Sequence, residues 1–182
     1  MIRPHIILVA AAFAGGVLRD QPRTLGRIPI PDVRPSVIPD SVPQLAKYFV
    51  GDWHCRGGTP SGKTLESGVT FAMALDGHWL RVEHVDVPPG RYKSLAMWPA
   101  DSAAHNLSTI FYDNFAGSRR FLGRWGADSI VWMRDTTEAG ARVESFTFRR
   151  TSASTYWYSW HVGRPGGAPT VLGDSATCTR VS

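Results

Sequence analysis

The chain has 182 residues and a mass of 20.0 kDa, enough for one domain with a substantial core. Hydrophobic residues make up 43%, charged residues 19%, and the mean hydropathy is −0.15, which excludes wholesale disorder and a polytopic membrane protein. The net charge of +5 is spread thinly: the adjacent basic pairs are Arg119-Arg120 and Arg149-Arg150, which we interpret as solvated strand ends, with an anion site as the alternative. No nucleic-acid partner is therefore expected.

Residues 1–14 have the pattern of a secretory signal peptide. A short basic start, Met1 to His5, precedes an apolar run of 13 residues from Ile6 to Leu18, which is too short to span a bilayer comfortably. Ala12-Phe13-Ala14 fits the small-x-small rule for cleavage. We expect an exported protein, periplasmic or extracellular, with no stable membrane span. A buried N-terminal strand or a short anchor is the alternative.

Residues 15–44 form a proline-rich segment. Six of the 13 prolines lie here, without aromatic residues and without clear periodicity. This composition predicts an extended linker, or a strap over the domain that follows.

From Leu45 onward the sequence predicts one all-β domain, residues 45–182, in which 45–50 could form a helical turn. Short apolar stretches with period-2 alternation recur between turn residues, and Asp76-Gly77 fits a two-residue hairpin turn. A strand meander leaves two exposed edges unless it closes, so the sequence predicts an antiparallel up-and-down β-barrel, with a β-sandwich as the main alternative. The roughly ten strands are expected at 51–57, 65–75, 78–87, 92–98, 105–112, 119–125, 129–136, 143–151, 154–162 and 171–180.

Several of these strands are apolar on both faces, so alternation alone does not fix which face points inward. Apolar outer faces also leave an oligomer possible. Small residues bear on whether the interior is hollow. Ala96, Gly123 and Gly173 leave space for a cavity if they face inward, whereas large residues at every inward position would give a filled, structural barrel.

The two cysteines, Cys55 and Cys178, lie near the two ends of the predicted domain. In an exported chain, an even number of cysteines suggests a disulfide. If the first and last strands are neighbours, as in a closed barrel, this bridge is geometrically natural. Two buried free thiols are the alternative.

Residues 57–64, GGTPSGKT, match the phosphate-binding pattern GxxxxGK[ST]. A nucleotide site of this kind requires a strand, the loop and then a helix. The segment after Thr64 contains Gly68 and alternates like a strand from Val69, and no repeated strand–helix pattern follows. The sequence therefore favours a glycine-rich hairpin loop over a nucleotide site.

Metal and nucleophile signatures are weak. His78 and His84 share one face of a predicted strand, but they lie about 20 Å apart and cannot ligate one metal together. No compact set of ligands accompanies them, so we expect no metal site. The hydrolase patterns GxSxG and HExxH are absent from the sequence.

Polar titratable groups on otherwise apolar strands are the best candidates for a ligand site inside a barrel. We expect a small apolar or aromatic ligand. The main alternative is an enzyme that uses the same cavity for acid–base chemistry, of isomerase, cyclase or hydratase type, whose catalytic residues the sequence does not identify. A satisfied core or rim side chain is the alternative at each position. The candidates are His78, His84, Tyr112, Arg134, Tyr158 and His161.

Three short motifs resemble those of calycin-type barrels, the group of the lipocalins and fatty-acid-binding proteins. They are FVGDW at 49–53, LDGHWL at 75–80 and FYD at 111–113. Within this group the chain is most similar to bacterial lipocalin-like and nitrobindin-like barrels of ten strands, over roughly residues 48–180. The resemblance implies a barrel with a single apolar cavity reached from one open end.

Nitrobindin-like members of the group bind haem through a His on the final strand. The predicted final strand here, 171–180, contains no His, and His161, one strand earlier, is the nearest substitute. The resemblance therefore leaves haem as a second alternative, and no cofactor is expected.

Overall fold

The computed structural model describes residues 43–100, 107–137 and 142–181. The predicted signal peptide and residues 15–42 of the predicted proline-rich segment lie outside the described residues. In the described part, a short helix, α1 (Gln44–Phe49), precedes ten strands. The strands are β1 (Gly51–Gly58), β2 (Thr64–Ala74), β3 (Trp79–Asp86), β4 (Lys93–Pro99), β5 (Leu107–Asp113), β6 (Ser118–Trp125), β7 (Ser129–Arg134), β8 (Val143–Arg150), β9 (Thr155–Gly163) and β10 (Val171–Arg180).

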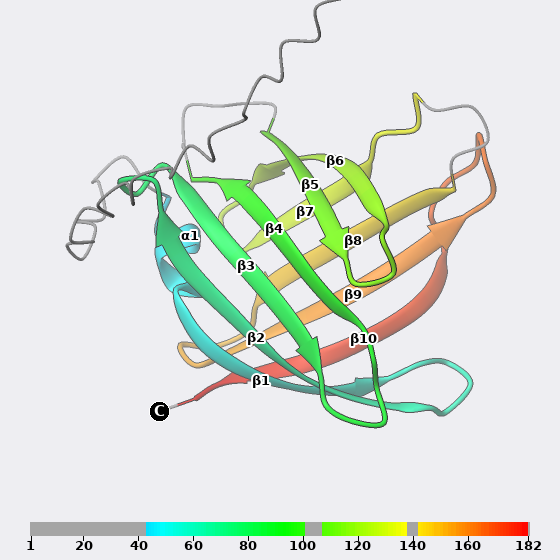
Figure 1. The fold of residues 1–182 in the computed structure, drawn as a ribbon, viewed down its shortest axis with the longest axis horizontal. Coiled ribbons are helices and arrows are strands. Elements are labelled where there is room, and N and C mark those ends of the chain that lie inside the picture. Colours follow the sequence, from blue (N-terminus) through cyan, green and yellow to red (C-terminus); the bar gives the residue numbers. More distant parts are fainter. Residues whose placement is uncertain (1–42, 101–106, 138–141, 182) are drawn as a thin grey trace, which may run out of the picture. The chain divides into compact units, whose positions relative to one another are not determined.

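The ten strands form a closed antiparallel barrel in which each strand pairs with its neighbours in sequence (Figure 1). β1 and β10 close it, with Trp53 opposite Arg180 and Gly58 opposite Ser175. Closure gives every strand two partners, which removes the exposed edges that an open meander would leave. The predicted up-and-down barrel is confirmed, and the β-sandwich alternative is wrong.

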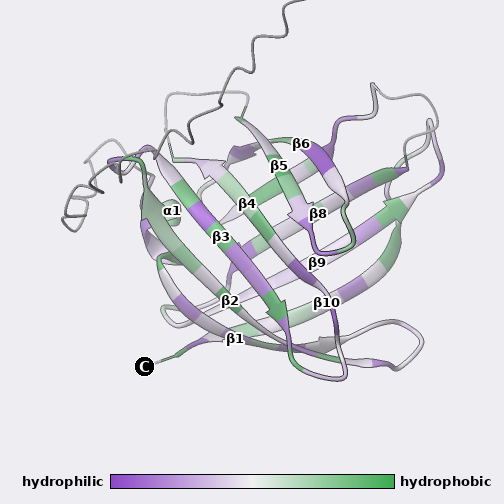
Figure 2. Ribbon diagram, viewed as in Figure 1, coloured by the Kyte–Doolittle hydropathy of each residue, from purple (hydrophilic) through white to green (hydrophobic). Residues whose placement is uncertain are grey.

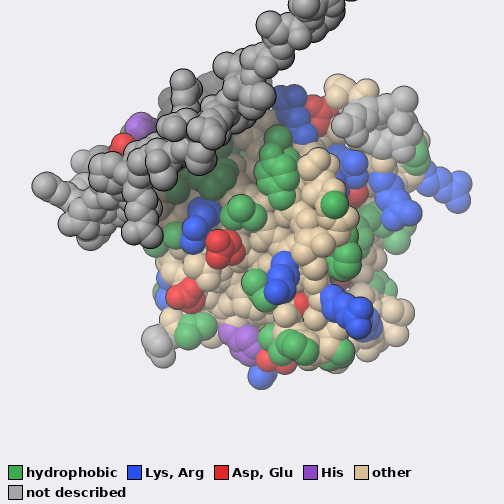
Figure 3. Space-filling view, viewed as in Figure 1, with side chains coloured by type: hydrophobic (Ala, Val, Ile, Leu, Met, Phe, Trp, Pro, Cys, Tyr) green, Lys and Arg blue, Asp and Glu red, His purple; other side chains and the backbone are tan. Residues whose placement is uncertain are grey.

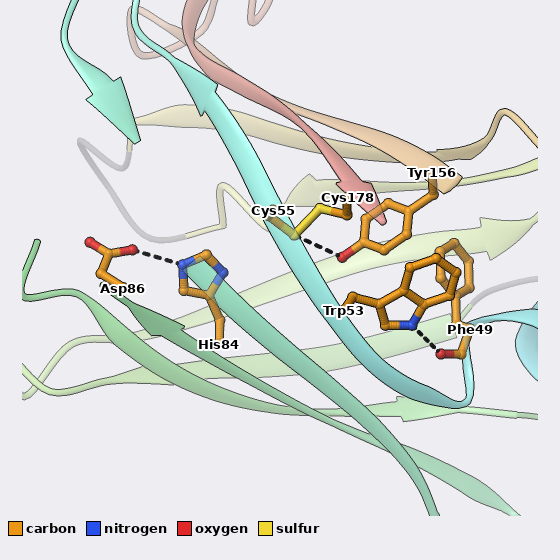
Figure 4. Close-up of a disulfide and its surroundings, with 7 residues drawn as sticks. All are labelled: Phe49, Trp53, Cys55, His84, Asp86, Tyr156 and Cys178. Atoms are coloured by element: carbon orange, nitrogen blue, oxygen red, sulfur yellow. Dashed lines mark hydrogen bonds and ion pairs between the residues drawn. A yellow bond between two sulfur atoms is a disulfide. The ribbon is translucent and has the colours of Figure 1, made fainter. Parts of the chain in front are cut away.

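The disulfide between Cys55 and Cys178 is also confirmed, and it joins the closing strands directly. The two residues are opposite each other in the β1–β10 register, and both are buried on the inner face. The Tyr156 hydroxyl lies 3.6 Å from Cys55 Sγ (Figure 4). Because a disulfide sulfur carries no proton, this hydroxyl is the donor of the contact.

Alternation along each strand separates the barrel interior from solvent. On β3, Leu80 and Val82 are buried while Arg81 is exposed, and the ribbon shows the matching change between hydrophobic and hydrophilic residues (Figure 2). On β9, Tyr156, Tyr158 and Trp160 share the inner face. The outer face that Figure 3 shows carries hydrophobic side chains scattered among lysines and arginines.

Helix α1 packs its apolar residues into one end of the barrel. Leu45 and Phe49 belong to the hydrophobic core, and the Phe49 ring lies 5.1 Å from Phe71 and 5.2 Å from Tyr156. The helix is held by side chains of β1 and β10: Trp53 Nε1 donates to the Phe49 carbonyl at 2.7 Å, and Arg180 donates to the Val50 carbonyl at 2.6 Å. This end of the barrel is therefore filled.

Two local predictions have different outcomes. Residues 59–63 form a tight hairpin turn between β1 and β2, which confirms the glycine-rich hairpin and lacks the helix that a nucleotide site requires. The prediction of a two-residue turn at Asp76-Gly77 is wrong. Ala74 pairs with Trp79, so the loop has four residues, and Leu75, Asp76 and Gly77 all adopt positive φ angles. An Asp at φ 57° is tolerated because its short side chain fits the left-handed region.

Candidate functional site

The barrel encloses a cavity of about 220 Å³, bounded by eight of the ten strands and the β3–β4 loop. Its polar lining residues lie toward the end of the barrel opposite α1. The lining residues are Leu65, Ser67, Val69, Val82, His84, Asp86, Tyr92, Ser94, Ala96, Trp98, Phe111, Arg119, Phe146, Phe148, Tyr156, Tyr158, Trp160 and Asp174.

Small inward side chains help to leave this space open. Ser67 on β2, and Ser94 and Ala96 on β4, all line the cavity. Gly123 and Gly173 have another role, because a Cβ atom at either position would lie within 2.6 Å of a tryptophan ring. These glycines give room to Trp132 and Trp160. Of the three small residues that the sequence singles out, only Ala96 therefore borders the cavity.

Aromatic side chains form most of the wall. The Phe146 ring stacks on Trp160 with centroids 6.3 Å apart, and Phe148 stacks on Tyr158 at 6.0 Å. Trp98 is fully buried and meets Phe148 edge to face at 4.9 Å. Such interlocking rings make a firm apolar surface that is complementary to another ring.

One side of the cavity is polar. His84 Nε2 lies 2.9 Å from Asp86 Oδ1, and the His84 ring meets Tyr92 edge to face (Figure 4 shows the His84–Asp86 pair). Arg119 donates to the Tyr92 hydroxyl at 2.9 Å and pairs with Glu144 at 3.0 Å. These side chains form a connected polar network at the edge of the aromatic wall.

Asp174 differs from the other carboxylates of the site. Burial, and after it the negative charge of Asp86, raise the pKa of the Asp174 carboxyl to about 6, although hydrogen bonding with Tyr158 acts to lower it. In the part of the chain that the structure describes, Asp174 is in no ion pair, and its Oδ1 atom accepts no hydrogen bond. Burial, with the charges of Asp174 and Asp86, also raises the pKa of Tyr158, which keeps its proton at neutral pH.

Three further lining residues carry a buried nitrogen for which the described residues provide no hydrogen-bond partner: Trp98 Nε1, Trp160 Nε1 and Arg119 Nε. An unsatisfied buried polar atom is destabilising by about 1–3 kcal/mol, so native proteins leave few of them unless water or a ligand completes them. With Asp174 Oδ1, four of the five such atoms among the described residues belong to side chains that line the cavity; the fifth is Trp132 Nε1.

The structure brings two of the six sequence candidates into the cavity wall, His84 and Tyr158. Arg134 lies just behind the wall, paired at 2.7 Å with Glu144, which also binds Arg119. The remaining candidates lie elsewhere. His78 is exposed in the β2–β3 loop, Tyr112 is 52% exposed, and His161 lies on the face of β9 opposite Tyr158.

Sequence reasoning missed Asp174 and Arg119. The register shift on β10 lies before Asp174, so Asp174 alternates regularly with the buried Ala176 and Cys178, and this alternation was a signal that it faces inward. Arg119 was interpreted as a solvated strand end, but it shares the inner face of β6 with the fully buried Phe121. Because Arg119 and Phe121 are two residues apart, the alternation along β6 was the sequence feature that indicated an inward Arg119.

The cavity does not fit a haem held in the way that the resemblance implies. His161 lies outside the wall, beside Ser159, and β10 carries no His. A cavity of roughly 150 Å³ holds one benzene ring, whereas a porphyrin joins four rings, so about 220 Å³ is small for it. Among the described residues, no group of three or more His, Cys, Asp or Glu side chains could hold a metal ion.

No protein-family model matches the chain, and no curated protein sequence does. Among solved structures, the chain is similar to the crystal structure of Rv2717c from M. tuberculosis, with a TM-score of 0.57 and 14% sequence identity. The match covers 80% of this chain and 100% of Rv2717c. At this identity the similarity shows a shared barrel fold. None of the helices in the described residues is long and apolar enough to cross a membrane.

Proposed function

We propose that this chain is an exported carrier that binds a small, mainly aromatic or apolar molecule inside its lipocalin-like barrel. The observation that carries the proposal is the cavity itself: about 220 Å³ of space, walled largely by aromatic rings and bordered by polar side chains such as His84, Asp86 and Asp174. A filled structural barrel would have no such space. Aromatic walls with a few convergent polar groups are typical of ligand sites.

The disulfide supports export. Bonds of this kind persist in oxidising compartments outside the cytosol, and Cys55–Cys178 joins the two strands that close the barrel. The predicted signal peptide at residues 1–14 points to the same destination.

Filling the cavity should weaken ligand binding strongly without unfolding the protein. Ala96→Phe adds one ring to the wall of a cavity large enough for about one ring, so we expect it to weaken binding of 2-phenylethanol at least tenfold. Tryptophan fluorescence titration of the full chain measures this, because Trp98 and Trp160 line the cavity. The matched control is Ala72→Phe, which adds the same ring to the outer face of β2, opposite Arg81. Equal affinities for the wild type and Ala96→Phe would place binding outside the cavity.

A proton-transfer enzyme that uses the same cavity is the second candidate, and Asp174 is the observation that favours it. A carboxyl with a pKa of about 6 can give and accept protons near neutral pH. The discriminating measurement is mass spectrometry of any molecule that co-purifies with the protein, before and after incubation. Chemical change that disappears in Asp174→Asn favours the enzyme, and an unchanged molecule favours the carrier.

A further inference from the structure

The charged groups inside the end of the barrel opposite α1 do not balance. Four carboxylates lie on inward positions there: Asp86, Asp113, Glu144 and Asp174. Two guanidinium groups, Arg119 and Arg134, face them. The described interior at this end therefore carries a net charge of about −2 when His84 is neutral and −1 when it is protonated.

Both guanidinium groups are already engaged. Arg119 pairs with Glu144 at 3.0 Å and with Asp113 at 3.5 Å, and Arg134 pairs with Glu144 at 2.7 Å. These two cations and two anions neutralise one another. The excess negative charge consequently lies with the other two carboxylates, Asp86 and Asp174, which line the cavity.

Asp174 is the uncompensated member of that pair. His84 lies against Asp86, while no described cation pairs with Asp174. The other titratable groups on this side of the cavity are Tyr158 from β9, Tyr92 from the β3–β4 loop, and Arg119 from β6. Tyrosine hydroxyls are neutral at physiological pH, so they leave the carboxylate charge in place.

The walls around these carboxylates suit a cation. Tyr158, Trp160 and Tyr92 all border the cavity with Asp86 and Asp174. Aromatic faces attract ammonium groups through their quadrupoles, and the attraction grows where water is excluded. A buried carboxylate gains most from a partner that is both charged and a hydrogen-bond donor.

We infer that the cavity takes a small amine in its ammonium form, with the nitrogen at Asp174 and Asp86 and an apolar or aromatic body along the ring wall. This inference rests on the proposed carrier function and specifies its ligand class. A cavity of about 220 Å³ has room for one ring with a short chain, since one benzene ring fits in roughly 150 Å³.

Three matched probes test the charge preference: 2-phenylethylamine, 2-phenylethanol and phenylacetate, which carry +1, 0 and −1 at about pH 7.5. We expect the full-length oxidised protein to bind the amine at least tenfold more tightly than the alcohol, and the acid most weakly, in isothermal titration calorimetry.

Asp174→Asn keeps the side-chain shape and removes the charge. We expect it to weaken amine binding at least tenfold and to leave binding of the alcohol nearly unchanged. The matched control is Asp76→Asn in the exposed β2–β3 loop, which makes the same change in net charge, and where Asn tolerates the positive φ angle. Circular dichroism establishes that each variant is folded.

The pH dependence of amine binding by the wild-type protein is a second measurement, and it requires no variant. Because Asp174 must lose its proton to pair with an ammonium, and its pKa is about 6, amine affinity should fall about tenfold between pH 7.5 and pH 5. Binding of 2-phenylethanol should not follow this profile.

The outcomes separate the two proposals. Preferential, pH-dependent binding of the amine supports both. Equal binding of amine and alcohol, or preference for phenylacetate, keeps the carrier and overturns the amine assignment. If none of the three probes binds at millimolar concentration, the carrier proposal fails, and the amine assignment fails with it.

Discussion

Removing the Cys55–Cys178 disulfide is expected to lower the free energy of unfolding by about 5 kcal/mol. The bridge spans 123 residues of sequence, and in the chain-entropy model a loop of about that length loses this much stabilisation when it is opened. The bond also joins the first strand to the last, so the unfolded chain without it must find the β1–β10 pairing by a long-range search.

Urea denaturation of the full chain measures this effect on the double variant Cys55→Ala with Cys178→Ala. The wild type with added reductant is the second sample, because reduction keeps both side chains. The double variant with and without reductant is the control, and its urea denaturation midpoint should be the same in both conditions. A loss below about 1 kcal/mol in both samples would show that barrel closure does not depend on the bridge.

Phe49→Ala should be the most damaging single substitution in the helix, with a loss of about 3–5 kcal/mol. The Phe49 ring is fully buried, and it contacts the rings of Phe71, Trp98 and Tyr156. A six-residue helix is not stable by itself, so α1 depends on this packing. Loss of the ring should release α1 from the end of the barrel and expose the core beneath it.

Two comparisons isolate this effect in thermal and urea denaturation. Phe49→Leu keeps most of the apolar volume and should lose less than about 1.5 kcal/mol. Phe115→Ala removes the same ring from a site that is 67% exposed, and should change stability by less than about 0.5 kcal/mol. If Phe49→Ala is no worse than Phe115→Ala, then α1 does not stabilise the barrel.

Much of the fold could be predicted because each strand carries its own local signal. Period-2 alternation on segments such as 78–87 and 154–162 located β3 and β9 to within one residue at each end. The disulfide was predictable from the even number of cysteines in a chain with a predicted signal peptide, and barrel closure supported it because closure brings Cys55 and Cys178 together. Inner and outer faces were harder to assign where both are apolar, as on β7 with Val131 and Trp132.

The cavity was less predictable because it depends on side chains from strands far apart in the sequence. His84 and Tyr158 could be chosen as polar residues on apolar strands. Asp174 alternates with the buried Ala176 and Cys178, so its inward orientation was available from the pattern, but its neighbours across the cavity were not. The pairing of Arg119 with Glu144 is likewise a long-range contact, between residues 25 apart, with no local pattern.

A crystal structure of the full chain grown with saturating 2-phenylethylamine tests the central claim most directly. We expect the ring inside the cavity, against Phe146, Phe148 and Trp160, with its nitrogen within hydrogen-bond distance of Asp174. A ring in the cavity with its nitrogen turned away from Asp174 would keep the carrier and contradict the amine assignment. A cavity closed by its own side chains, with the amine bound only on the outer surface, would contradict the carrier function itself.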